Sequence, residues 1–188
     1  MISIALTGGI ASGKSTVLEM LSKKFPVIDS DAIVAELYKN KRVCSKIKNE
    51  LGTCDKKELS GIVFNNKNKR TLLEKILHPL VLKEIKSQLK RLKKQNKKIA
   101  FVDVPLLFES GSEKKFDYTL CVCCTKSQQI ERLHKKGFSR RDALMRINSQ
   151  MLLKKKIKYA DFVIYNNKSL KNTRMQINEF LTTLKELI

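Results

Sequence analysis

The segment Gly8–Ser15 fits the pattern Gly-x-x-x-x-Gly-Lys-Ser, which is typical of loops that bind phosphate groups. It lies between the apolar run Ile2–Leu6, a predicted strand, and Thr16–Phe25, where apolar residues recur at helical spacing. Glycines let backbone N–H groups converge on phosphate oxygens, and the N-terminus of the helix adds partial positive charge. We expect Lys14 to reach the β- and γ-phosphates and the Ser15 hydroxyl to bind Mg²⁺. The sequence therefore predicts a nucleoside triphosphate site.

Two acidic residues follow the next short strand, Val27-Ile28. Asp29 and Asp31 stand at the carboxyl end of that strand, the place where ligands bind in open α/β sheets. A carboxylate there could accept the proton of an attacking hydroxyl while Lys14 and Mg²⁺ hold the phosphate. Asp31 is also well placed to cap the helix predicted at 32–38, so one residue could serve both purposes.

These candidate residues need a sheet to position them. The predicted strands are 2–6, 27–28, 99–104, 118–124 and 161–165. The predicted helices are 16–25, 32–38, 42–51, 56–64, 70–77, 80–92, 127–135, 139–151 and 170–187, with His78-Pro79 separating two of them. Strands that alternate with helices and are apolar on both faces indicate a parallel sheet covered on both sides. The fold class is therefore α/β, with three αβα layers.

The charge balance is strongly basic, with 39 Lys+Arg against 18 Asp+Glu and a formal net charge of +21. Most of the excess lies in two segments, Lys83–Lys98 and Arg132–Lys158. Such clusters attract polyanions, whether RNA, an acidic membrane surface or a polyphosphate metabolite, and they are also found on faces that are simply solvated. No apolar run is long enough to span a membrane, and we expect a soluble cytoplasmic protein.

The five cysteines do not form a recognisable framework. Their count is odd, which disfavours both a zinc site and a set of disulfides. Cys121, Cys123 and Cys124 fall in an apolar strand, where a free cysteine packs as a small hydrophobic residue.

Beyond the glycine-rich loop, several motifs occur together and in order over about residues 2–185. They are Thr7–Thr16, Asp29-Ser30-Asp31, His78-Pro79, Asp103-Val104-Pro105-Leu106-Leu107-Phe108-Glu109 and Ala160-Asp161-Phe162-Val163-Ile164-Tyr165-Asn166. In this combination the chain resembles the dephospho-CoA kinase family. The resemblance implies a P-loop NTPase fold of the nucleoside-monophosphate-kinase type. It also implies ATP-dependent phosphorylation of the ribose 3′-hydroxyl of dephospho-CoA, the last step of coenzyme A biosynthesis, with Mg²⁺ accompanying ATP.

The resemblance also assigns roles by position. Catalytic roles fall on Asp31, as the base, and on Lys14 and Arg146. The residues implied for ATP binding are Gly8, Gly9, Ala11, Ser12, Gly13, Lys14, Ser15, Thr16, Arg132 and Asn166, with Ser15 also binding the metal. Those implied for the acceptor are Thr7, Asp31, His78 and Asp103, and the family's acid at the position of Asp103 can lie near the metal as well as near the acceptor. The implied single domain, 1–188, has a core of about 1–31, 99–135 and 159–188, a helical acceptor subdomain of about 32–98 and a lid of about 136–158.

Some positions depart from the family pattern or have a second interpretation. Ala11 stands where the family usually has Gly, and its methyl group is tolerable only if φ is negative. Lys136 stands where a second lid arginine is usual, and a lysine cannot form a bidentate fork on phosphate. His78 could simply satisfy a backbone carbonyl, and Glu109 could order the loop after its strand.

Two other functions remain open on the sequence alone. One is a P-loop kinase with a different acceptor, such as a nucleotide or a shikimate-like alcohol. The other is a basic nucleic-acid-binding protein regulated by ATP, although no RNA-binding module is recognisable and aromatic residues for base stacking are few. We expect ATP and dephospho-CoA as the ligands, with no nucleic acid and no membrane, and the sequence says nothing of oligomeric state.

Overall fold

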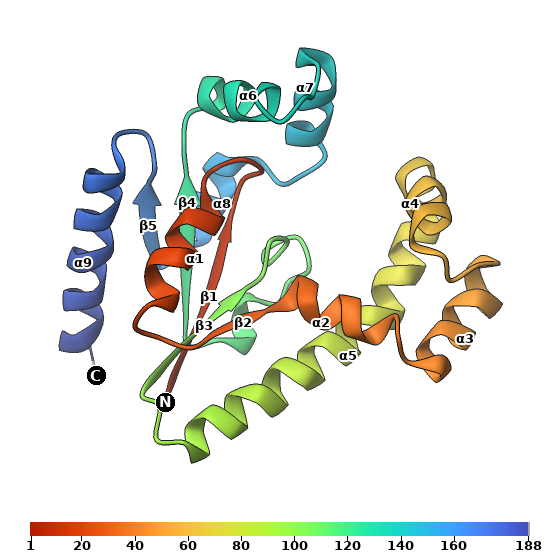
Figure 1. Ribbon diagram of the computed structural model, residues 1–188, viewed down its shortest axis with the longest axis horizontal. Helices are drawn as coiled ribbons and strands as arrows, with labels where there is room; N and C mark the ends of the chain where they lie inside the picture. The colour runs from red at the N-terminus through yellow and green to blue at the C-terminus, as the bar shows by residue number, and fades with distance from the viewer. Residues whose placement is uncertain (188) are drawn as a thin grey trace. The chain divides into compact units, whose positions relative to one another are not determined.

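The apolar runs form a five-stranded sheet in the order β2-β3-β1-β4-β5 (Figure 1). Its strands are β1 (Ile2–Gly8), β2 (Val27–Asp29), β3 (Ile99–Asp103), β4 (Tyr118–Cys123) and β5 (Phe162–Tyr165). The pairs β1–β3, β1–β4 and β4–β5 are all parallel, as the sequence predicts. This computed structural model describes residues 1–187, apart from the side chains of Phe64 and Asn65; Ile188, the end of the expected domain, lies outside the described residues.

The chain divides into two compact units. The first contains residues 1–28 and the chain from Asn96 onward, and the second contains Asp29–Gln95. The helices of the first unit are α1 (Lys14–Ser22), α6 (Lys126–His134), α7 (Arg140–Asn148), α8 (Leu153–Tyr159) and α9 (Leu170–Glu186), with a 3₁₀ turn at Glu113–Lys115. Those of the second unit are α2 (Ser30–Leu37), α3 (Lys41–Leu51), α4 (Lys56–Asn65) and α5 (Lys67–Lys94).

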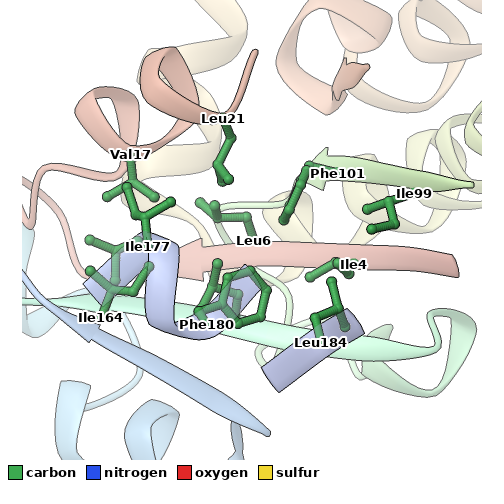
Figure 2. Packing of buried hydrophobic residues seen from close by; sticks show 12 residues of the cluster. Ile4, Leu6, Val17, Leu21, Ile99, Phe101, Ile164, Ile177, Phe180 and Leu184 are labelled. Atoms are coloured by element: carbon green, nitrogen blue, oxygen red, sulfur yellow. The ribbon is translucent and has the colours of Figure 1, made fainter. Parts of the chain in front are cut away.

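One face of the sheet is covered by α1 and α9. Ile4 and Leu6 of β1 and Phe101 of β3 pack against apolar residues of these two helices (Figure 2). The helix residues in this cluster are Val17, Leu21, Ile177, Phe180 and Leu184. Because side chains alternate along a strand, Ala5 points to the other face, where it contacts Leu107 and Phe108. Burial on both faces explains why the strands read as continuous apolar runs.

The segment after α7 differs from the prediction. The expected helix 139–151 ends at Asn148, and a further helix, α8, follows it. Ser139 does cap α7, since its hydroxyl accepts a hydrogen bond from the N–H of Asp142. Helix α8 was missed because Leu153–Tyr159 is so rich in lysine that no apolar periodicity stands out.

In the second unit, the predicted break at His78-Pro79 does not occur. Helix α5 runs through Pro79 as one element. Proline removes one N–H donor, and the carbonyl left without it belongs to Lys75, four residues earlier. Lys75 and Pro79 are both exposed, so water can satisfy that carbonyl, while Ile76 and Leu77 on the other side are buried. Packing of the apolar side therefore outweighs the local effect of proline.

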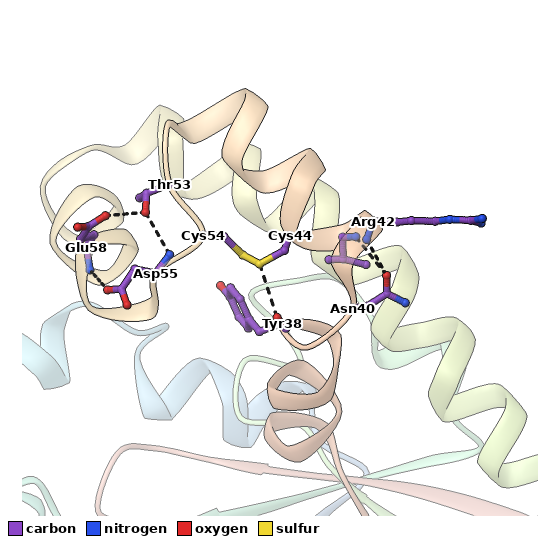
Figure 3. The surroundings of a disulfide bond; sticks show 9 residues. Tyr38, Asn40, Arg42, Cys44, Thr53, Cys54, Asp55 and Glu58 are labelled. Carbon is purple, nitrogen blue, oxygen red and sulfur yellow. Dashed lines mark hydrogen bonds between the residues drawn. A yellow bond between two sulfur atoms is a disulfide. The ribbon is translucent and has the colours of Figure 1, made fainter.

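The expectation that the cysteines form no disulfide is wrong for one pair. Cys44 of α3 and Cys54, in the turn before α4, are joined by a disulfide (Figure 3). Their spacing fits no motif, and folding of the chain between them brings the two together. Cys121, Cys123 and Cys124 are free and buried, as expected. No helix among residues 1–187 has the length and apolar character needed to cross a membrane.

Candidate active site

The glycine-rich loop connects β1 to α1 at the carboxyl edge of the sheet. Gly13 precedes the first residue of α1 and has φ +92°, in the left-handed region. A Cβ atom at this position would lie 1.9 Å from Asn166 Nδ2, so any side chain would clash as well as strain the backbone. The loop thus requires glycine here both for its backbone conformation and for the close approach of Asn166.

Ala11 also lies in the left-handed region, with φ +57°. The condition that its φ be negative is therefore not met. An L-residue in this conformation is strained, because its Cβ approaches the following carbonyl oxygen. The loop keeps the shape that glycine would allow, and surrounding contacts hold Ala11 in it.

Lys14 is the first residue of α1, directly after Gly13, and its ammonium forms an ion pair with both carboxylate oxygens of Asp103. Asp103 is the last residue of β3 and is 9% exposed. The register pairs it with Leu6 of the neighbouring β1, so the carboxyl ends of the two strands bring the lysine and the aspartate to one edge. The structure thus places a cation, a carboxylate and the loop together within the first unit.

Four side chains hold the backbone of the loop. Gln129 donates to the Ile10 carbonyl at 2.7 Å, and the Ile10 N–H donates to Gln150 Oε1 at 2.9 Å. Arg132 Nη1 donates to the carbonyls of Ala11 and Ser12, at 3.2 and 3.0 Å. Asn166 Nδ2 also donates to the Ser12 carbonyl, at 3.0 Å.

Two of these four side chains were not predicted as site residues. Arg132 and Asn166 were expected to bind ATP, and the structure shows both in contact with the loop backbone. Gln129 and Gln150 were missed, although they stand in the segments Gln129–Leu133, just before the predicted lid, and Arg146–Gln150, within it. The only feature of the sequence that could have indicated them is that a glutamine begins the first segment and another ends the second.

One polar atom in the loop lacks a partner. Ser12 is 1% exposed, and its hydroxyl has no hydrogen-bond partner among the described residues. A buried hydroxyl without a partner is costly, which favours a ligand atom as its partner. This supports the loop as a phosphate site.

The residues at this edge fit a magnesium ion that arrives with a nucleotide. Mg²⁺ prefers oxygen donors and is usually held by one or two protein groups together with substrate phosphates, without an all-protein cage. The Ser15 hydroxyl and the Asp103 carboxylate are such donors. Among the described residues no group of three His, Cys, Asp or Glu side chains could hold a metal by itself.

In the second unit, the cap of α2 is Asp29 and not Asp31. The Asp29 carboxylate accepts hydrogen bonds from the N–H groups of Asp31, at 2.8 Å, and Ala32, at 3.1 Å. Asp31 lies in the first turn with its side chain exposed. The capping role expected of Asp31 is therefore wrong. His78 is half-buried in the middle of α5.

Thr7 and Arg146 have partners within the first unit. Thr7 is fully buried, and its hydroxyl donates to the Pro105 carbonyl at 3.0 Å. Arg146, on α7, lies over the ring of Phe138, with Cζ 4.2 Å from the ring centroid. Thr7 thus joins the ends of two strands, and Arg146 stacks within the segment expected to form the lid. Their assigned roles toward substrate stay predictions.

Comparison with known proteins identifies the family. A family model described as dephospho-CoA kinase matches residues 2–172. A dephospho-CoA kinase of Lactobacillus johnsonii is 41% identical, covering 95% of this chain and 96% of the relative. The chain belongs to the dephospho-CoA kinase family. A member from Bdellovibrio bacteriovorus is 37% identical, covering 98% of this chain and 96% of its own length.

Solved structures agree with this assignment. A Thermus thermophilus protein superimposes with a TM-score of 0.84 at 33% identity, covering 97% of each chain. A dephospho-CoA kinase from Campylobacter jejuni gives a TM-score of 0.71 at 31% identity, covering 98% of this chain and 97% of the other. A shikimate kinase from Acinetobacter baumannii shares the fold alone, with a TM-score of 0.58 at 14% identity. The chain is a kinase with the P-loop αβα fold, and its activity depends on ATP.

Proposed function

We propose that this chain transfers the γ-phosphoryl group of ATP to the ribose 3′-hydroxyl of dephospho-CoA, giving CoA and ADP. The observation that carries the proposal is the Lys14–Asp103 pair beside a glycine-rich loop, in a chain that matches the dephospho-CoA kinase family over residues 2–172. The new O–P bond forms at the 3′-oxygen as the bond between the β–γ bridging oxygen and the γ-phosphorus breaks. The hydroxyl proton passes to a base, and ADP leaves with the bridging oxygen.

The loop residues and Lys14 would hold the triphosphate. Backbone N–H groups of the loop and the N-terminus of α1 favour anionic oxygens, and Lys14 supplies a full positive charge where charge develops in transfer. Ser15 and Asp103 would hold Mg²⁺, which when bound neutralises phosphate charge. Arg132 and Asn166 would support the nucleotide by holding the Ala11 and Ser12 carbonyls that they contact.

Asp31 would be the base that takes the proton of the 3′-hydroxyl. Its side chain is exposed, and the N-cap of α2 is Asp29. Because Asp31 does not cap the helix, its carboxylate is available for this role. His78 would contact the acceptor, and Arg146 would leave the Phe138 ring to reach the transferring group when the part of the lid that contains α7 closes. A closed site would exclude water and so limit ATP hydrolysis.

The test is formation of CoA by the purified chain. ATP, Mg²⁺ and dephospho-CoA are incubated with the protein, and the products are separated and identified by mass. We expect CoA and ADP in equal amounts, with no phosphorylation of shikimate or of nucleoside monophosphates in parallel reactions. Phosphorylation of one of those acceptors without formation of CoA would overturn the proposal.

A further inference from the structure

The most deeply buried charged side chain among the described residues takes no part in the proposed phosphoryl transfer. Lys156, on α8, is 0% exposed. Its ammonium donates to the Gly8 carbonyl at 3.3 Å and to the Pro105 carbonyl at 3.1 Å, and it pairs with Glu109 Oε1 at 2.8 Å. An ammonium has three N–H donors, and each of these partners matches one of them.

The two carbonyls belong to the segments that carry the candidate site. Gly8 is the first residue of the phosphate-binding loop, and Pro105 follows Asp103 by two residues. The Thr7 hydroxyl donates to the same Pro105 carbonyl. Lys156 thus ties the end of β1 to the exit of β3, the two places from which Lys14 and Asp103 are presented.

Glu109 extends this connection to the segment after α7. Its Oε1 also accepts a hydrogen bond from the Met151 N–H at 3.0 Å. The adjacent Gln150 accepts the N–H of Ile10 in the loop. The short stretch between α7 and α8 is therefore anchored both to the loop and, through Glu109, to Lys156.

We propose that Lys156 is a positioning residue for phosphoryl transfer: its buried ammonium fixes Gly8 and Pro105 and so sets the distance between the loop and Asp103. The proposal rests on the proposed function for its kinetic consequences, but not for its effect on nucleotide binding. Small displacements of groups that hold phosphates cost rate steeply, because transfer depends on alignment.

The test compares Lys156→Met with Lys155→Met, the neighbouring exposed lysine on the same helix. Each protein is assayed below its melting temperature, with the folded fraction measured by circular dichroism. For Lys156→Met we expect kcat to fall by about tenfold and the dissociation constant of ADP to rise by about threefold, while the KM for dephospho-CoA stays within about twofold. Lys155→Met should match the wild type in all three.

A purely structural lysine would lower the melting temperature and leave kcat per folded molecule and ADP affinity unchanged. That result overturns the proposal. If Lys156→Met does not fold, Glu109→Gln serves instead, since its amide oxygen can still accept from Met151 while the charge opposite Lys156 is lost. A lower kcat with the KM for dephospho-CoA unchanged then supports the proposal, and wild-type kcat overturns it.

The two proposals fail in different ways. Wild-type protein that forms no CoA refutes the proposed function, and calorimetric titration with ADP then decides the role of Lys156 without any acceptor. Weaker ADP binding by Lys156→Met supports positioning of the loop, and equal affinity refutes it.

Discussion

Two neighbouring carboxylates divide two tasks between them. Asp29 caps α2 through the N–H groups of Asp31 and Ala32, while Asp31 itself is exposed. The sequence places both acids at the end of a strand and cannot say which one the helix uses. Side-chain geometry decides, because a cap must precede the helix and point back at its first N–H groups.

Asp31→Asn should lower turnover by about 10²- to 10⁴-fold, the usual contribution of a general base, and leave ATP affinity nearly unchanged. Asp29→Asn is the matched control, since asparagine caps as well as aspartate and turnover should stay within about threefold of wild type. Steady-state formation of CoA and calorimetric titration with ATP measure the two effects. Normal turnover in Asp31→Asn would contradict its assignment as the base.

Ala11→Gly should stabilise the protein. Replacing alanine removes about 1–2 kcal/mol of strain from the folded state, because the left-handed conformation is unfavourable for it. The greater freedom of glycine in the unfolded chain offsets about 0.4–1 kcal/mol of this, so the free energy of unfolding should rise by about 0.5–1 kcal/mol. Urea denaturation measures it. Ala35→Gly, inside α2, should instead destabilise by about 1 kcal/mol. A loss of stability in both variants would show that Ala11 is not strained.

At the scale of elements, the second unit combines long helices with a local crosslink. Val43, Ile47 and Leu51 of α3 pack with Leu59 of α4 and with Ile76 and Leu77 of α5. The Cys44–Cys54 disulfide, with a sequence separation of 10, joins the first turn of α3 to the segment between α3 and α4, beside Tyr38 and the Thr53–Asp55 turn (Figure 3). Lys56 lies over the Tyr38 ring at 5.2 Å from its centroid.

Reduction of this disulfide should lower stability by about 2–3 kcal/mol, because a short closed loop no longer restricts the unfolded chain. Thermal unfolding with and without dithiothreitol measures the change. The variant in which Cys44 and Cys54 are both replaced by Ser should melt at the temperature of the reduced wild type and show no response to dithiothreitol. A wild type equally insensitive to reductant would contradict the prediction.

At the scale of the whole molecule, the two basic segments differ in how far their side chains are buried. The lysines of 83–98 are exposed, which agrees with a solvated face. The Arg132–Lys158 segment supplies side chains that hold the loop, Arg132 and Gln150, as well as the buried Lys156. Apolar burial dominates inside the sheet, where desolvation raises the pKa of Cys121 and of Cys123 to about 12.

These thiols should remain protonated and unreactive in the folded protein well above pH 9. Both folded pKa values exceed the usual value of an unfolded cysteine, so their contribution to stability is complete below about pH 8.5 and is lost as pH rises toward 12. Iodoacetamide labelling at pH 9 followed by mass spectrometry should leave Cys121 and Cys123 unmodified until denaturant is added. Rapid labelling of the native protein would show that the strand is accessible.

The sequence alone determined the parallel sheet, the phosphate-binding loop and the family, because apolar runs, the glycine–lysine spacing and the ordered motifs are local properties of the chain. Tertiary structure decided what depends on partners distant in sequence. It paired Lys14 with Asp103, kept α5 continuous through Pro79, joined Cys44 to Cys54 and buried Lys156 beneath the loop. From the sequence, a lysine in a lysine-rich helix is expected to be exposed to solvent. Folding surrounds the Lys156 ammonium with two backbone carbonyls and a carboxylate, and no local sequence pattern predicts this because all three partners are distant in sequence.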